Sequence, residues 1–344
     1  MRPSMTIPAA RRRPGTGLLY LLTSGLLWGT GGLTGSLLSR AAGLSALSVA
    51  ACRLTAGGVL IVIFLTVTGR RWPAGRAAWT RIAVIGGLAA LYQSCYFTSV
   101  ALTSVALATL VTIGTAPVIV LGVYRVTGRR AGRLAPVAAC LALTGLGFLV
   151  GLPSGFSQTT VLASAGLAVL AAAGFAAMTL TGARPVPGLD DLTVTGFGFT
   201  LGGLILMPLA AALGGLSFRT GPEAVGLLIA LGTGPTAVAY TLYFRGLRQA
   251  GASTAALLAL LEPLTGAILA AFILGQRLSA TGIVGAATLV AAVIITVRGA
   301  GEVREGEPSV PDQPAPGQPE PGQPEPGQPE PGQPAPVTGL VDTC

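Results

Sequence analysis

The chain of 344 residues is 51% hydrophobic and only 10% charged, whereas soluble domains carry about 25% charged residues. This composition excludes an ordinary soluble protein and predicts a membrane protein. All 21 basic residues are arginine, and we attribute the net charge of +9 to membrane orientation and not to nucleic-acid binding.

Apolar runs of about 20 residues predict helices that span a membrane. The chain contains ten such runs, five in each half. They lie at residues 17–38, 46–67, 82–102, 105–126, 134–152, 161–182, 192–212, 224–244, 253–274 and 280–297. The sequence therefore predicts an all-α membrane protein of ten transmembrane helices, with five-helix repeats at residues 17–152 and 161–298 and tails at 1–16 and 299–344.

The first run follows three consecutive arginines, Arg11 to Arg13, as the apolar part of an export signal would. It is longer than the about 7 to 15 residues of such a segment, and nine further runs follow it. We therefore expect an uncleaved first helix.

Part of the first half recurs in the second half, which indicates that the fold arose by duplication. The matching residues are Tyr96-Phe97 with Tyr243-Phe244, Pro117 with Pro263, and Gly128 with Gly275. Repeats of this kind in a membrane protein are typical of transporters.

The two repeats are predicted to be inverted, because each contains an odd number of spans. The arginines agree with this topology, since basic residues concentrate in cytoplasmic loops. Seventeen of the 21 arginines fall on the side of the N terminus, whereas only Arg40, Arg219 and Arg277 fall on the other side. We expect a protein of the inner cell membrane with both termini in the cytoplasm.

Glu262 is the one carboxylate inside a predicted span, directly before Pro263. An ionisable group within the membrane suggests a functional site, and backbone freed by a proline is tolerated where it faces protein or a water-filled cavity. Glu262 is therefore a candidate for substrate or proton binding. The alternative is a structural carboxylate hydrogen-bonded to a neighbouring helix.

Arg53 is the matching cation, within the second span. Arginine keeps its charge in proteins, so Arg53 needs a partner such as Glu262, a cluster of carbonyl groups or an aqueous cavity. It is a candidate for attracting an anionic group. The alternative is a side chain that extends to the membrane surface.

Helix-breaking residues recur at matching places, which in inverted repeats points to a transport site. Pro117 and Pro263 are expected to interrupt the fourth and ninth spans, and Pro235 the eighth. Polar and aromatic residues accompany them in the third and eighth spans: Tyr92, Gln93, Tyr96, Thr236, Tyr240 and Tyr243. Each of these could serve packing alone, but together they suit a substrate pocket.

Glycines four residues apart let membrane helices approach closely. The pairs Gly25 and Gly29, Gly31 and Gly35, and Gly198 and Gly202 have this spacing. We expect packing faces at all three.

The chain changes character at about residue 301, and the motif Pro-Gly-Gln-Pro-Glu repeats from residue 316 onward. Such a segment buries too little apolar surface to offset its ordering entropy. We expect a disordered cytoplasmic tail, which serves as a tether or as a docking strip for another protein.

Several short motifs make the chain similar to the drug/metabolite transporter superfamily, and specifically to its ten-helix EamA-type members. They are Leu27-Trp28-Gly29, Arg53, Tyr96-Phe97, Ala116-Pro117, Leu261-Glu262-Pro263 and Leu274-Gly275. The resemblance covers residues 17–298 and implies an inner-membrane carrier that often exports amino acids or other small metabolites, with a central cavity between its halves. Family members often have Gly-Glu after the proline-broken helix, but here Arg129 and Gln276 follow the glycines.

We expect a secondary transporter that works by alternating access, with Glu262 coupling proton movement to substrate movement and Trp28 among the site residues. A chain without lysine cannot contain the nucleotide-binding motif that ends in Lys-Ser or Lys-Thr. The alternative is a membrane sensor or scaffold that signals through its tail; an enzyme is not expected, since one glutamate without histidine is a poor set of acid–base groups.

Neither a metal site nor another cofactor is expected, because the four cysteines lack paired spacing. The expected partners are a small-molecule substrate and the lipid bilayer, with no nucleic acid. A homodimer remains one possible assembly.

Overall fold

The structure is a computed structural model that describes residues 15–129, 131–150, 155–273, 275 and 279–305. The first 14 residues and the repeats of the acidic tail lie outside the described residues. Apart from one isolated bridge between Val186 and Leu189, all regular structure in the described residues is helical.

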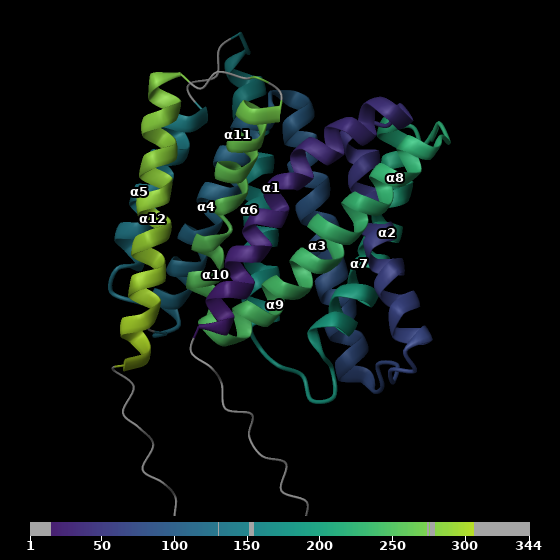
Figure 1. The fold of residues 1–344 in the computed structure, drawn as a ribbon, viewed down its shortest axis with the longest axis horizontal. Coiled ribbons are helices and arrows are strands. Elements are labelled where there is room, and N and C mark those ends of the chain that lie inside the picture. Colours follow the sequence, from purple (N-terminus) through teal and green to yellow (C-terminus); the bar gives the residue numbers. More distant parts are fainter. Residues whose placement is uncertain (1–14, 130, 151–154, 274, 276–278, 306–344) are drawn as a thin grey trace, which may run out of the picture. The chain divides into compact units, whose positions relative to one another are not determined.

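The first repeat contains five helices (Figure 1). They are α1 (Thr16–Ala42), α2 (Ala46–Val67), α3 (Arg76–Leu102), α4 (Val105–Val126) and α5 (Ala135–Val150). Three of the corresponding passages in the second repeat are unbroken: α6 (Gln158–Gly182), α7 (Asp191–Gly214) and α12 (Ala280–Glu305).

The other two passages of the second repeat are divided into shorter helices. One consists of α8 (Pro222–Leu231), the π-helix η1 (Gly232–Val238) and α9 (Ala239–Ala250). The other consists of α10 (Ala252–Leu258) and α11 (Leu261–Ile273). Counted over the described residues, eight passages are long and apolar enough to cross a membrane; α5 is a shorter apolar helix, and α1 has 27 residues. The predicted all-helical architecture of ten passages is confirmed.

Matching N-cap residues begin matching helices. Ser45 caps α2 by accepting a hydrogen bond from the Ser48 amide, and Asp190 caps α7 by accepting one from the Thr193 amide. A side-chain oxygen at this position satisfies an amide that has no partner within the helix. The two caps place Ala46 and Asp191 at equivalent first positions of α2 and α7.

The packing has the symmetry that two inverted repeats require. Helix α1 packs on α9 and α11 of the other repeat, and its counterpart α6 packs on α3 and α4. Helices α2 and α7, which are also counterparts, pack on each other. In Figure 1 the α2–α3 and α6–α7 loops lie at the end of the bundle where α1 begins, and an ion pair of 3.3 Å between Arg70 and Asp190 joins them.

Two of the three expected glycine faces are contacts between backbones. A Cβ atom at Gly29 would overlap Thr265 of α11, and one at Gly25 would lie 2.7 Å from the Leu261 Cβ. In the same way, a Cβ at Gly202 of α7 would lie 2.7 Å from the Gly86 carbonyl oxygen of α3.

Gly35 differs from that expectation, whereas a Cβ at Gly31 would lie close to Pro235, 3.2 Å from its Cβ. Around Gly35 the nearest atoms to an added Cβ are 3.8 and 4.0 Å away, which is ordinary van der Waals distance. Both glycines line a cavity, so the small side of α1 at this level leaves space at Gly35 and packs closely on Pro235 at Gly31.

The expected helix breaks are present in the second repeat only. Before Pro263 the backbone turns more tightly, with the Glu262 amide donating to the Ala259 carbonyl at 3.0 Å, so that α10 ends and α11 begins. Pro235 lies inside η1. The expectation for Pro117 was wrong, because α4 continues through it from Val105 to Val126: one missing amide donor is tolerated when the surrounding helix packing is retained.

Candidate functional site

A cavity of about 260 Å³ lies between the two repeats. Its walls come from α1, α2, α3 and the first residue of α4 in the first repeat and from α8, α9 and α11 in the second. Cavities of roughly 300 Å³ and above are usual for small-molecule sites, so this one suits a compact ligand.

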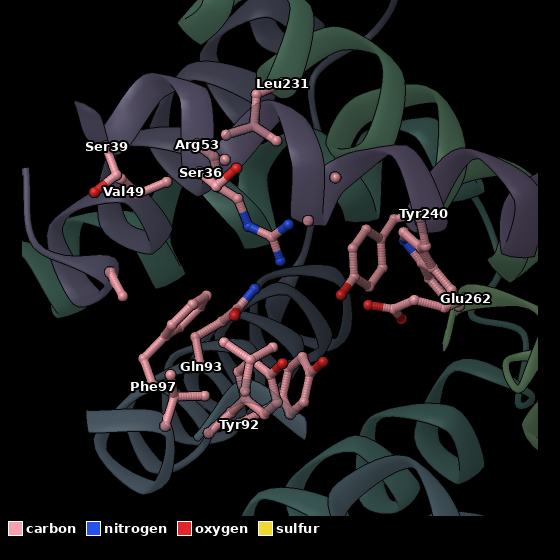
Figure 2. Close-up of a pocket in the computed structure, with 18 residues that line it drawn as sticks. Ser36, Ser39, Val49, Arg53, Tyr92, Gln93, Phe97, Leu231, Tyr240 and Glu262 are labelled. Atoms are coloured by element: carbon pink, nitrogen blue, oxygen red, sulfur yellow. The ribbon is translucent and has the colours of Figure 1, made fainter. Parts of the chain in front are cut away.

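Two opposite charges face this cavity. Arg53 reaches it from α2 and Glu262 from the first turn of α11, and Figure 2 shows the guanidinium group and the carboxylate group entering it from different sides. Among the described residues the ion pairs are Arg70–Asp190 and Arg248–Asp191, so Arg53 and Glu262 do not pair with each other. The structure therefore places both predicted charges at one cavity with neither neutralising the other directly.

The helix break determines where Glu262 lies. As the second residue of α11, it directly follows the turn at Ala259 and Leu260. Helix α1 can approach this turn because Gly29 has no side chain; a Cβ there would lie 3.0 Å from the Glu262 carbonyl oxygen. Glu262 is thus held at the contact between α1 and α11.

Within the part of the chain that the structure describes, three buried polar atoms at the cavity have no hydrogen-bond partner: the Arg53 Nε, the Gln93 Oε1 and the Trp28 Nε1. Gln93 is only 1% exposed and Trp28 only 5%. A buried donor or acceptor without a partner costs about 1–3 kcal/mol, so such groups usually bond to water or to a ligand. All three residues line the cavity.

Trp28 and Tyr240 of the cavity wall pack on each other, and Tyr243, which does not line the cavity, packs on Trp28. The Trp28 ring lies 4.8 Å from Tyr240 and 4.9 Å from Tyr243, measured between centroids. Figure 2 shows the Tyr240 hydroxyl and the Glu262 carboxylate pointing toward each other. A second chamber of about 10 Å³, bordered by Thr112 and Glu262, has room for about one water molecule.

The cavity is lined by seven of the nine predicted binding residues: Trp28, Arg53, Tyr92, Gln93, Tyr96, Tyr240 and Glu262. The hydroxyl of Tyr96 is already hydrogen-bonded to Thr109 at 2.8 Å. Tyr92 and Tyr240 are 7% and 3% exposed. The roles of these residues remain predictions.

Two predicted residues, Thr236 and Tyr243, do not line the cavity. The hydroxyl of Thr236 donates to the Leu231 carbonyl at 2.8 Å within its own helical segment. Tyr243 shares a hydrogen bond of 2.8 Å with Thr179 of α6. Both side chains belong to the packing that surrounds the cavity.

Part of the α1 wall was not predicted from the sequence. Gly32, Ser36 and Ser39 line the cavity together with Gly31 and Gly35. A signal was present, since Trp28, Gly32, Gly35 and Ser39 follow the spacing of one helix face. We interpreted the glycines as a packing face because close helix packing also requires small residues.

The lining residues also indicate which end of the bundle the cavity approaches. Ser39 and Ala46 flank the α1–α2 loop, and Val100 and Val105 flank the α3–α4 loop. The opposite end carries the arginine-rich loops, such as the α2–α3 loop with Arg70 and Arg71. The cavity therefore extends toward the end of the bundle with few arginines.

Two segments of the chain, residues 15–151 and 162–298, match the model of the EamA-like transporter family. The uncharacterized transporter YwfM of Bacillus subtilis (strain 168) is 29% identical over 279 residues, which cover 80% of this chain and 92% of that protein. The uncharacterized inner membrane transporter YicL of Salmonella typhimurium is 26% identical over 290 residues, covering 81% of this chain and 94% of that protein.

The fold also matches a solved crystal structure. The two are 22% identical, with a TM-score of 0.71, and the match covers 83% of this chain and 99% of the other. At this identity the likeness concerns the fold alone.

Proposed function

Because the chain belongs to the EamA-like transporter family, we propose that it is a secondary transporter that carries a small metabolite by alternating access of one central cavity to the two sides of the membrane. The observation that supports this most strongly is the placement of Arg53 and Glu262 at one cavity between the repeats, without an ion pair between them. Charged groups inside a membrane protein commonly mark a substrate or ion pathway.

The charges favour a substrate that itself carries both signs, such as an amino acid. Arg53 and Gln93 offer donors to a carboxylate, and an arginine can bind a carboxylate with two parallel hydrogen bonds. Glu262 attracts an ammonium group, and the faces of Trp28 and Tyr240 add cation–π attraction. The volume of about 260 Å³ favours a small member of this class.

Glu262 is also the group that we propose for proton coupling. A carboxylate that holds a proton no longer attracts an ammonium group, so protonation from one side of the membrane releases a substrate that was bound in the deprotonated state. This competition exchanges protons for substrate and drives export from the cell.

We assign the protein to the inner cell membrane with both termini in the cytoplasm. Basic residues concentrate in cytoplasmic loops, and here the α2–α3 loop contributes Arg70 and Arg71, whereas Arg40 and Arg219 are at the opposite end. In this orientation the cavity faces the outside.

The test is untargeted metabolite profiling of cells and medium, with and without overexpression of the protein. We expect one group of amino-acid-like metabolites to fall in the cells and rise in the medium. The variant Arg53→Gln should abolish this change at equal protein level, because the cavity loses its cation. A profile that is unchanged by overexpression would contradict the proposal.

The same assay separates transport from signalling through the tail. Deletion of residues 306–344 leaves all described helices intact and should leave the export unchanged. Loss of the metabolite change on deletion would instead favour a sensor or scaffold.

A further inference from the structure

The cavity extends toward the end of the bundle with few arginines. At the arginine-rich end Tyr243, Phe244 and Leu247 of α9 are each only 1% exposed, so packing closes this end, and polar contacts there tie α9 to α6 and α7. Arg248, in the last turn of α9, lies with its Nη2 2.8 Å from the Oδ1 of Asp191, the first residue of α7. The Tyr243 hydroxyl of α9 shares a hydrogen bond of 2.8 Å with Thr179 of α6.

The ion pair is less exposed than an ordinary surface pair, so salt and water screen it less. The side chains of Arg248 and Asp191 are 25% and 12% exposed. The contact is a close approach of charges without the alignment of a hydrogen bond. It also joins a cation at a helix C terminus to an anion at a helix N terminus, and both placements are favoured by the helix dipoles.

Apolar packing surrounds these contacts. A Cβ atom at Gly182 of α6 would lie 2.6 Å from the Phe244 ring, and one at Gly246 of α9 would lie 2.7 Å from Leu21 of α1. Helix α9 therefore packs tightly between α1 and α6 at this end. Opening this end of the cavity requires α9 to move away from both helices.

Because the repeats are inverted, each contact at the closed end has a counterpart position at the open end. Helices α9 and α7 are the counterparts of α3 and α2, so the contact between α9 and α7 corresponds to the contact between α3 and α2 in the first repeat. Asp191 then matches Ala46, because both follow the N-cap of their helix. In the register that matches Tyr243 with Tyr96, Arg248 corresponds to Ala101.

The second polar contact also lacks a counterpart at the open end. In that register Thr179 corresponds to Gly32, which has no side chain and has open space around its Cα. The hydroxyl of Tyr96 bonds instead to Thr109 within its own repeat. Neither polar contact can therefore form at the end where the cavity opens.

We propose that the Asp191–Arg248 ion pair and the Thr179–Tyr243 hydrogen bond are a one-sided lock, which holds the empty carrier closed at its arginine-rich end and open at the other. The two repeats have different residues at these positions, so the polar contacts form at one end only. The two access states therefore differ in free energy before substrate binds. This inference rests on the alternating-access function proposed above. It adds which state is at rest and which residues set it.

The test measures access to each end in the purified full-length protein, reconstituted in lipid vesicles. Cys52, Cys95, Cys140 and Cys344 are first replaced by alanine. A single reporter is then introduced: Leu247→Cys, at a position that is 1% exposed and at the closed end, or Ser36→Cys, in the cavity. The readout is the rate of labelling by a membrane-impermeant maleimide, added on the side that the reporter faces.

With Asp191→Asn, we expect labelling at the Leu247→Cys reporter to rise about fivefold or more, the factor that corresponds to about 1 kcal/mol, and labelling at the Ser36→Cys reporter to fall. Arg248→Gln should act alike, and the double variant should add little to either single variant, since both remove the same contact. Tyr243→Phe keeps the ring but removes the hydroxyl, and should shift both reporters in the same directions.

The matched control is Arg70→Gln. The neighbouring pair of Arg70 with Asp190 has a distance of 3.3 Å, but its side chains are 54% and 46% exposed. Such exposed pairs contribute little, so labelling should not change.

Unchanged labelling with Asp191→Asn would overturn the lock, and so would an equal rise at both reporters, which indicates general loosening of the fold. The assay needs no substrate. A failure to find transported solutes would therefore count against the proposed function, whereas the lock is decided by the labelling rates.

Discussion

At the scale of single residues, Glu262 differs from every other carboxylate in the described helices by its place at the central cavity. Glu223 lies in the first turn of α8 and is exposed, and Asp190 and Asp191 lie at the start of α7, where they face arginines. Glu262 is the carboxylate that can meet both a substrate and a proton in the space between the repeats.

Glu262→Gln should therefore uncouple transport from the pH gradient. Glutamine keeps the size of the side chain and its hydrogen-bonding capacity but cannot exchange a proton. In proteoliposomes loaded with the substrate identified by profiling, we expect a pH gradient to stop driving substrate uphill. The measurement is uptake with and without the gradient, and Glu223→Gln is the control that should behave as the unaltered protein does. Full pH-driven transport by Glu262→Gln would rule out coupling at this residue.

The sequence led to Arg53 and Glu262 because charged side chains in an apolar span are costly and stand out without any structure. It could not separate Tyr240, which lines the cavity, from Tyr243, which does not. The reason lies just before them: the π-helix η1 changes the turn that precedes α9, and a π segment alters which side chains share a face. Pro235 predicted an interruption of this span, but not that the interruption would be a π-helix.

At the scale of helices, two glycines of α1 differ in the space around them at the contact between α1 and α11. A Cβ at Gly29 would overlap Thr265, whereas a Cβ at Gly32 would have no atom within 4 Å. Gly29 is thus needed for packing, and Gly32 is not.

Gly29→Ala should destabilise the protein by about 1–3 kcal/mol, the usual cost of forcing an extra methyl group into a packed contact. Gly32→Ala should leave the stability unchanged, because its methyl group enters the cavity. The measurement is the midpoint of thermal unfolding of both purified variants in the same detergent. Equal midpoints for the two variants would show that the close approach of α1 to α11 is not required.

At the scale of the whole chain, the ten passages and their inversion followed from properties that add up along the sequence. Apolar length determines whether a segment can span a membrane, and the distribution of arginines needs no knowledge of packing. The cavity could not be obtained in this way. It depends on which helices meet, and the pairing of α1 with α9 and α11 joins segments that are far apart in the chain.

The two charges of the cavity come from different repeats, and neither has a charged counterpart. Ala116 occupies the position before Pro117 that corresponds to Glu262. Counted from the N-caps of α2 and α7, Arg53 corresponds to Gly198. A dimer of two first repeats would therefore hold two arginines in the cavity, and a dimer of two second repeats would hold two glutamates. This chain holds one of each.

The two halves are thus chemically complementary, because each supplies a charge that the other lacks. Neither half can replace the other. Residues 1–154 and 155–344, expressed together as separate chains, should reassemble and restore the export measured by metabolite profiling. Either half expressed alone should restore none of it, even where it pairs with a second copy of itself. Activity from a single half would mean that one sign of charge is enough, and that the ancestral dimer could already do what the fused protein does.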